Sequence, residues 1–594
     1  MLTSLLLLAA APGPVADVGA PQEARRILER SCMGCHDSEE VEGGFDLERL
    51  LAADGTSPWL FEWRRASAAL EIDAMPPKRK LGREDRRVLL EYLAGVEARA
   101  LEEGGGPGYE PLRRLTRTEL ENSLSDLLAV DVQLAALLPD ELASEGGFEA
   151  SSATLFVHPD WLERVGAAVR IVLRSALPDE GRASLRGDPE EVLPRLMRRA
   201  WRRPLTEAER LEAQGRLAEL QETLPPRAAL REALAAALAS PHFLMRLEDV
   251  QVEPGEVGPF ALASRLSFFL WASGPDERLL DLAAQGTLAD PRVLQTQIER
   301  MLEDHRALAL GEGFAAQWLR IGGLGTVVKP DPIDVPFMTD SVMAAMREEV
   351  ARFFLELVVA DHPLEALLQA RFSYLNEELA DFYGVEGVRG ERLRRVARLP
   401  AERTGVLGKA AVLATTAFPD RTSPVVRGNW VLSDLLGTPP PPPPPGASEF
   451  DEELMEELEE LSAEGRMALH RRKPSCAACH DRIDPLGLAL EDYDRFGRLR
   501  DEEDRLASVT GTLPGGARFR GVRGLREGLA EHAADDLARQ ASRRLLAYAL
   551  GRPLTWSDER TVVDLATKLR EEGWGALVRA VIASRPFRHQ EQAP

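Results

Sequence analysis

The chain has 594 residues, more than one hydrophobic core usually accommodates, so several domains are expected. Hydrophobic residues make up 44% of the sequence, as in ordinary globular proteins, and the formal net charge is −24 at pH 7. This charge argues against nucleic acid or an anionic membrane surface as the partner. It favours a basic redox partner or a neutral small molecule, unless it serves solubility alone.

Residues 1–20 are predicted to be a cleaved signal peptide. The apolar run Leu2–Leu8, continued by Ala9–Ala11, is far shorter than the roughly 20 residues of a membrane span. The small residues Val18-Gly19-Ala20 suit a signal peptidase, although no Lys or Arg precedes the apolar run. We therefore expect a periplasmic or exported protein with no transmembrane segment.

The chain contains only four cysteines, and they form two identical motifs. These are Cys32-Met33-Gly34-Cys35-His36 and Cys476-Ala477-Ala478-Cys479-His480, both of the form C-x-x-C-H. This is the attachment signature of c-type haem. Two thiols at this spacing reach the two vinyl groups on one edge of the porphyrin, and the adjacent imidazole becomes the proximal iron ligand. The motifs predict two covalent haems c, held by Cys32, Cys35 and His36 and by Cys476, Cys479 and His480.

Three other uses of the cysteine pairs compete with haem. One zinc ion could join the two pairs, or each pair could close a structural disulfide in an oxidising compartment. Both alternatives leave the two following histidines unexplained. A thioredoxin-like redox motif requires a neighbouring βαβ pattern, which the sequence does not show.

Helical periodicity dominates the chain between the two motifs, so the predicted fold class is mainly α and multidomain. The clearest helical segments are Arg26–Arg30, Arg86–Ala100, Glu119–Leu128, Ala228–Ala239, Ala261–Ala272, Val342–Leu357 and Arg543–Ala549. The best strand candidates are Gly405–Leu413 and Thr510–Arg520, the second with Pro514-Gly515-Gly516 as its turn.

Gly- and Pro-rich breaks suggest the domain boundaries. We expect an N-terminal class I-like cytochrome c domain at 21–103, then helical domains at 109–180, 188–250 and 258–390. A second haem-binding domain follows at 398–505, and a C-terminal helical domain at 510–590. The second haem domain includes the proline run 439–445, an extended spacer. The acidic segment Asp451–Leu461 after it is predicted to be a solvated helix.

The chain resembles the planctomycete-type multidomain cytochrome c proteins, in which two haem motifs flank helical domains of unknown function. Besides the haem motifs, the resemblance rests on matches in chain order: Leu115-Thr116-Arg117-Thr118-Glu119, Arg202-Arg203-Pro204-Leu205-Thr206, Ser264–Trp271, Gln317-Trp318-Leu319, Leu375–Ala380, Thr422–Gly428, Ile483–Gly487 with Leu490–Asp494, and Tyr548–Arg552. One departure is Gly497-Arg498-Leu499-Arg500, where the family has an aromatic residue at the position of Leu499.

The expected distal ligand of the first iron is Met75, which lies 39 residues after His36 and precedes Pro76-Pro77. Prolines beside such a methionine stiffen its loop, and the resemblance implies the same Met-Pro-Pro element. His/Met ligation raises the reduction potential, which suits electron transfer. Trp59 and Trp63 are expected to pack against the macrocycle.

The second iron has no obvious distal ligand, because no methionine follows His480. His470, Met467 and His532 are the named candidates, of which His470 is preferred. The other expectations are a vacant or water-bound position, or a ligand from another domain. Arg421, Arg427, Arg498 and Arg500 are expected either to neutralise haem propionates or to lie on the solvated surface.

Three functions fit these features. The favoured one is an exported dihaem cytochrome that transfers electrons to or from a periplasmic redox partner protein. The second is a dihaem oxidoreductase or peroxidase whose second haem is the reactive site. The third is a surface- or polymer-binding protein whose haems serve a companion enzyme.

Overall fold

The computed structural model describes residues 22–53, 57–76, 80–106, 112–139, 141, 148–179, 185–247, 255–325, 330, 335–441, 465, 474–505 and 509–590. The predicted signal peptide, the candidate ligands Met467 and His470, the segment Asp451–Leu461 and most of the proline run lie outside these residues. The described chain is mainly helical, as predicted. It divides into two compact units; of the described residues, the first comprises those within 22–103, residue 441 and 474–479, and the second comprises the others.

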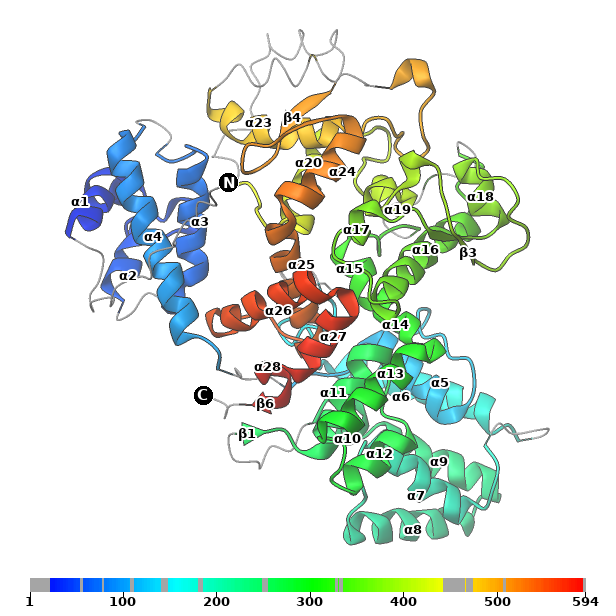
Figure 1. The fold of residues 1–594 in the computed structure, drawn as a ribbon. Helices are drawn as coiled ribbons and strands as arrows, with labels where there is room; N and C mark the ends of the chain where they lie inside the picture. Colours follow the sequence, from blue (N-terminus) through cyan, green and yellow to red (C-terminus); the bar gives the residue numbers. More distant parts are fainter. Residues whose placement is uncertain are drawn as a thin grey trace, which may run out of the picture. The chain divides into compact units, whose positions relative to one another are not determined.

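Within residues 22–103, the described part of the first unit contains the helices α1 (Gln22–Ser31), α2 (Leu47–Ala52), α3 (Leu60–Glu71) and α4 (Arg83–Glu103) (Figure 1). Their apolar faces meet in one core that includes Ile27 of α1, Leu50 of α2, Trp63 of α3 and Leu93 of α4. The Asp46 side chain caps α2 by accepting a hydrogen bond from the backbone N–H of Arg49.

The second unit begins with a group of helices within residues 113–247. They are α5 (Arg117–Leu128), α6 (Pro159–Ala176), α7 (Pro189–Ala200), α8 (Glu207–Gln221), α9 (Pro226–Leu238) and α10 (Pro241–Leu244). Capping boxes start α5 at Thr116 and α8 at Thr206. Buried leucines and valines of these helices form one continuous core.

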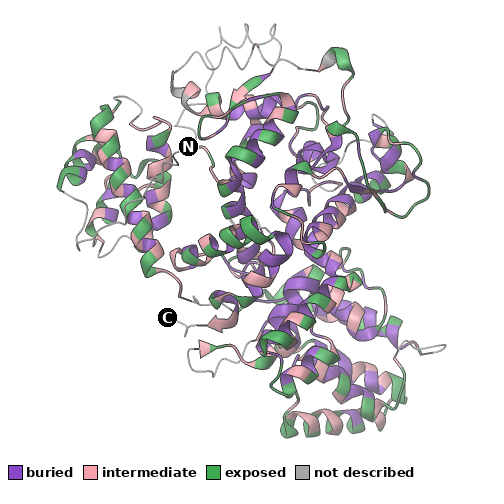
Figure 2. Ribbon diagram, viewed as in Figure 1, coloured by how far each residue is buried: buried purple, intermediate pink, exposed green. Residues whose placement is uncertain are grey.

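The middle of the second unit is centred on α11 and α16. Its helices are α11 (Pro259–Trp271), α12 (Glu277–Ala284), α13 (Pro291–Glu303), α14 (Leu308–Leu310), α15 (Ala316–Trp318), α16 (Asp340–Val359), α17 (Ala366–Gln369), α18 (Glu377–Tyr383), α19 (Ala410–Thr415) and α20 (Pro424–Trp430). Every residue of α11 from Ala261 to Trp271 is buried, and purple marks such buried stretches in Figure 2.

The chain ends in α23 (Pro474–Leu488), α24 (Gly521–His532), α25 (Ala534–Leu550), α26 (Glu559–Glu572), α27 (Trp574–Ala583) and α28 (Arg585–Arg588). The boundary between the two units falls within α23, between Cys479 and His480.

The strands that the structure describes form three antiparallel pairs. They are β1 (Gly255–Glu256) with β6 (His589–Gln590), β2 (Ser373–Leu375) with β3 (Arg394–Val396), and β4 (Thr510–Thr512) with β5 (Arg518–Arg520). The pairing of β4 with β5 confirms the hairpin predicted at Thr510–Arg520. The strand predicted at Gly405–Leu413 is wrong: a 3₁₀ turn and α19 occupy it. Its residues are buried on all sides, and a short apolar run carries no period that separates strand from helix.

Contacts between distant segments tie the second unit together. Val257 in the chain after β1 donates its N–H to the carbonyl of Arg588 at 2.8 Å. Arg265 of α11 is 1% exposed, and its guanidinium donates to the carbonyl oxygens of Pro586 at 3.3 Å and Phe587 at 2.7 Å. The start of the middle region is therefore completed by the last helix of the unit.

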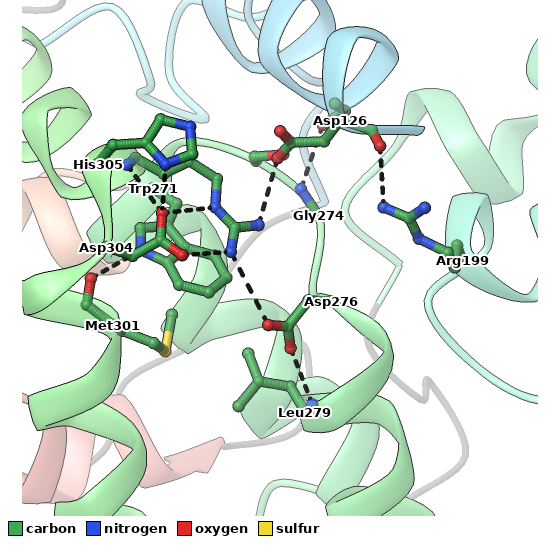
Figure 3. Close-up of polar contacts among 12 residues, drawn as sticks. Asp126, Arg199, Trp271, Gly274, Asp276, Leu279, Met301, Asp304 and His305 are labelled. Carbon is green, nitrogen blue, oxygen red and sulfur yellow. Dashed lines mark hydrogen bonds and ion pairs between the residues drawn. The ribbon is translucent and has the colours of Figure 1, made fainter. Parts of the chain in front are cut away.

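An ion-pair network connects three parts of the second unit (Figure 3). Asp126 lies in the last turn of α5, and its carbonyl oxygen accepts a hydrogen bond from Arg199 of α7 at 3.1 Å. The guanidinium of Arg306 lies 3.6 Å from the Asp126 carboxylate, 3.8 Å from that of Asp276 and 2.7 Å from that of Asp304. Asp276 is the N-cap of α12, and Asp304 is the N-cap of the 3₁₀ turn His305–Ala307. Arg306 therefore connects the N-terminal ends of these two elements to α5.

Candidate functional site: two C-x-x-C-H motifs

The first C-x-x-C-H motif follows α1 directly and folds into one 3₁₀ turn, Met33–Cys35. The N–H of Cys32 donates to Leu28 at 2.9 Å, and the N–H of Cys35 donates to Cys32 at 3.2 Å. The turn brings the two cysteines and His36 together, as the haem assignment requires. Burial, with a smaller contribution from Cys35, raises the pKa of the Cys32 thiol to about 11. In the folded chain this thiol is therefore protonated at neutral pH.

Aromatic side chains support the imidazole of His36. The Phe45 ring packs edge-on against it with centroids 5.3 Å apart, and Trp63 packs against Phe45 at 6.3 Å. Both His36 Nδ1 and Trp63 Nε1 are buried, with no hydrogen-bond partner among the described residues. Buried polar atoms are normally paired, so two orphaned nitrogens beside the motif fit a site that takes an additional polar or metal-bearing group. Trp63 is otherwise a core residue, 1% exposed.

Met75 lies just after α3 and is half-buried. An ion pair closes the segment around it, because the Asp73 carboxylate accepts from Lys80 Nζ at 2.6 Å and also from Arg86. The backbone N–H of Met75 donates to the carbonyl of Ala69 at 3.4 Å. These contacts hold Met75 by residues on both sides of it, which suits a ligand that must not exchange with water.

The second C-x-x-C-H motif lies on the first turns of α23, where Cys476, Cys479 and His480 are half-buried. His480 Nδ1 is 2.8 Å from Oδ1 of Asp484, one helical turn later. The Asp484 side chain is 0% exposed. A histidine that ligates a metal commonly donates its second ring nitrogen to a carboxylate in this way. The motif therefore fits the proximal side of a haem iron.

Two glycines allow α20 and α23 to cross in close contact. A Cβ atom on Gly487 would overlap the carbonyl oxygen of Pro424, and one on Gly428 would overlap that of Ile483. Gly428 and Gly487 each end one of the sequence matches on which the family resemblance rests. Their conformational role is thus steric: they let the backbone of α20 support the helix that carries His480.

Arg427 of α20 fixes the chain that follows α23. It is 0% exposed, and its guanidinium donates to the carbonyl oxygens of Leu490 at 2.8 Å, Tyr493 at 3.1 Å and Asp494 at 2.8 Å. It also pairs with the Glu491 carboxylate at 2.8 Å. The expectation that Arg427 lies on the solvated surface is therefore wrong. Its two terminal nitrogens already donate to acceptors of the protein itself, whereas its buried Nε has no hydrogen-bond partner among the described residues.

The other three arginines lie nearer to solvent. Arg421 pairs with its neighbour Asp420 at 2.9 Å, and Arg498 pairs with Asp494 at 3.0 Å. Arg500 donates to the carbonyl oxygen of Glu491 at 2.8 Å. The structure thus gives each of them a protein partner.

Four of the sequence matches meet at a cavity of about 290 Å³ in the second unit. They contribute Thr116 to Glu119, Phe268 with Phe269, Gln317, and Tyr548 with Ala549. In the wall of this cavity, Arg113 makes a bidentate pair with the buried Glu119 at 2.7 Å. Burial opposes ionisation of Glu119, but Arg113 outweighs it and lowers the pKa of that carboxyl. These motifs therefore line a cavity whose charged residues Arg113 and Glu119 pair with each other, and they are distant in sequence from both cysteine pairs.

None of the four cysteines forms a disulfide. In the part of the chain that the structure describes, no three His, Cys, Asp or Glu side chains gather to hold a metal ion, so the single zinc site that would join the pairs has no counterpart there. Of the candidate distal ligands for the second iron, only His532 is described. It ends α24 and is half-exposed, 3.8 Å from the Glu531 carboxylate. Among the described helices, none has the length and apolarity to cross a membrane.

Reasoning from the sequence missed Asp484 and the partners of Arg427. The sequence did contain a signal for the contact of Asp484 with His480, because the two residues are four positions apart and such positions share a face of a helix. It contained none for the partners of Arg427, because three of the acceptors are backbone carbonyls more than 60 residues away.

Five family models match the chain. Each is described as a protein of unknown function: DUF1587 at residues 113–178, DUF1595 at 189–248, DUF1592 at 257–385, DUF1588 at 403–503 and DUF1585 at 515–587. No curated protein and no solved structure matches the chain. The DUF1588 match includes the second C-x-x-C-H motif, Arg427 and Asp484. The five matched domains are the planctomycete-type multidomain cytochrome-associated set, and none of them is a cytochrome c haem model.

Proposed function

We propose that this chain is an exported dihaem c-type cytochrome that transfers electrons in the periplasm. The observation that carries the proposal is the pair of C-x-x-C-H motifs, each with both thiols outside disulfides and with its imidazole held by neighbouring side chains. The predicted signal peptide and the matched cytochrome-associated domains agree with it.

In this proposal the protein's residues attach, ligate and orient the haems. Cys32 with Cys35, and Cys476 with Cys479, would form the thioether links. His36 and His480 would be the proximal ligands, and Met75 the distal ligand of the first iron. When bound, each haem would supply a one-electron iron couple. The Phe45 contact holds the first imidazole and the Asp484 contact holds the second.

The redox partner is proposed to be a periplasmic protein with a basic docking surface. The chain carries 97 Asp and Glu against 73 Lys and Arg, and haem propionates would add further negative charge. Complementary charge speeds the encounter of redox proteins and makes its rate fall as salt is added. Nucleic acid would be repelled by the same charge.

A dihaem oxidoreductase is the second candidate, and one observation favours it. The two proximal histidines have unlike surroundings: an aromatic ring contacts His36, whereas a buried carboxylate contacts His480. A dihaem enzyme requires two haems with different iron environments, because one haem stores electrons and the other reacts with the oxidant. The second site would then have an open or water-bound distal position.

Haem stoichiometry tests the primary proposal. The full chain, expressed with a cytochrome c maturation system, should gain the mass of two haems. Cys476→Ser with Cys479→Ser should remove one, and the matched double variant Cys32→Ser with Cys35→Ser should remove the other. A wild-type mass without haem, or bound zinc in its place, would refute the proposal.

Ligand binding separates carrier from catalyst. If the second iron is open, electron paramagnetic resonance of the oxidised protein should show a high-spin ferric signal beside the low-spin His/Met signal. Carbon monoxide should then bind about one haem per chain. Two low-spin irons that bind no added ligand would leave electron transfer alone, and would make His470 the expected sixth ligand.

A further inference from the structure

The His480–Asp484 pair is a built feature of α23. A carboxylate that is 0% exposed lies 2.8 Å from Nδ1 of an imidazole one turn earlier on the same helix. Burying a carboxylate is costly unless hydrogen bonds compensate. The neighbouring helix α20 is held against this part of α23 through Gly428 and Gly487. The carboxylate is therefore fixed in place by the packing of two helices.

This contact determines which nitrogen of His480 faces a ligand. An ionised carboxylate only accepts hydrogen bonds, so Nδ1 must be the nitrogen that carries the proton. Nε2 then keeps its lone pair, which is the form of imidazole that binds a metal. The carboxylate also increases the electron density that the ring donates to the metal, which favours the more highly charged ferric ion over the ferrous ion.

The first site lacks this arrangement. The nearest aromatic partner of His36 is Phe45, and the described residues provide no hydrogen-bond partner for His36 Nδ1. The expected distal ligand of the first iron, Met75, moreover stabilises ferrous iron. The missing carboxylate at His36 and the Met75 ligand act in the same direction, because each raises the reduction potential of the first haem relative to that of the second.

We infer that Asp484 is a positioning residue that fixes Nε2 of His480 toward the second haem iron and makes the second haem the lower-potential one of the pair. The inference rests on the proposed function, since it requires that both haems are attached. It also assigns an order to the two reduction potentials, here called the polarity of the chain: in the one-electron-reduced protein the electron resides on the first haem, and the second haem stays oxidised.

Spectroelectrochemical titration of the full protein tests the polarity without any change at Asp484. The wild type should show two separate potentials. The Cys476→Ser/Cys479→Ser variant should lose the lower one, and Met75→Ala should shift only the higher one downward. Equal potentials, or loss of the higher one in the double Ser variant, would overturn the inference.

Substitution of the carboxylate tests its cause. Asp484→Asn keeps the shape but removes the charge, and it should raise the lower potential by at least about 59 mV, a tenfold change in the one-electron equilibrium. The iron–histidine stretching frequency in the resonance Raman spectrum of the ferrous state should fall. Asp484→Glu should restore part of both signals, which a merely structural role would not do.

Asp481→Asn is the matched control, because it removes one carboxylate from the same helix at an exposed position. It should leave both potentials at their wild-type values, because the charge of an exposed carboxylate is screened by solvent and salt. If Asp484→Asn retains two haems with wild-type potentials, or shifts no more than Asp481→Asn, the inference fails. The haem mass of the same preparations decides the proposed function separately, so the two failures are distinguishable.

Discussion

Replacing Arg427 should loosen the segment that follows the second motif. Arg427→Met removes the hydrogen-bond donors of the carbonyl oxygens of Leu490, Tyr493 and Asp494. It also removes the main cation of the Glu491 carboxylate, and Glu491 is only 7% exposed. Breaking a buried ion pair from one side costs about 3–5 kcal/mol. Burial lowers the pKa of Arg427 while Glu491 opposes that shift, so the guanidinium and the carboxylate depend on each other.

Hydrogen exchange measured by mass spectrometry suits this prediction, because the chain has more than one unit and a single global unfolding energy is not defined. Peptides covering 484–500 should lose about 3–5 kcal/mol of opening free energy in Arg427→Met. Arg421→Met is the control: its pair with Asp420 is exposed on both sides, so protection should hardly change.

A second substitution separates the lost cation from the lost packing. Glu491→Leu in the Arg427→Met background should recover part of the protection, because it removes the buried charge that was left behind. If Arg427→Met changes the opening free energy by less than about 1 kcal/mol, the reasoning is refuted, since a buried donor to three carbonyls would then carry no stability.

Three further predictions concern other parts of the chain. Met75→Ala should abolish the weak sulfur-to-iron absorption band of the oxidised protein, and a band that persists would assign another methionine. Gly487→Ala should force α23 away from Pro424 and reduce attachment of the second haem, measured by mass, while the first haem stays attached. The hydrogen bond from Arg306 lowers the pKa of Asp304 to about 2, below its unfolded value of about 3.9. The pair therefore stabilises the fold above about pH 4 and is lost as the pH falls toward 2, so Arg306→Met should move acid unfolding, followed by circular dichroism, to higher pH.

The helices and the hairpin at Thr510–Arg520 could be predicted because their signals are local. Apolar spacing marks α5, α9 and α16, and Pro514-Gly515-Gly516 marks the turn. The segment Gly405–Leu413 could not be predicted, because its conformation depends on burial from all sides. The left-handed φ of +61° at Gly405, where the chain passes against the backbone of Leu368, is likewise set by a neighbour 37 residues away.

The candidate site divides in the same way. The cysteines and histidines were predictable because covalent haem attachment needs them at a fixed spacing along the chain. The surroundings of the imidazoles were not, because Phe45 contacts His36 only through the conformation of the connection between α1 and α2. Likewise, α20, which packs against the helix of Asp484, is distant from it in sequence. Arg427 shows the limit most clearly: its residue type suggested a haem propionate or the solvated surface, and its acceptors are mostly backbone carbonyls.

The contact of Arg265 with the last helix has a consequence for how the chain is made. Its two carbonyl acceptors come 321 and 322 residues later. At roughly 5–20 residues per second, a ribosome needs roughly 16–64 s to add that stretch. Throughout this interval α11 has been synthesised, but the C-terminal segment that contacts Arg265 has not, so part of its surface stays exposed. Nascent chains of this protein should therefore occupy holding chaperones for tens of seconds, and a fragment that stops before residue 586 should aggregate even if every earlier helix forms.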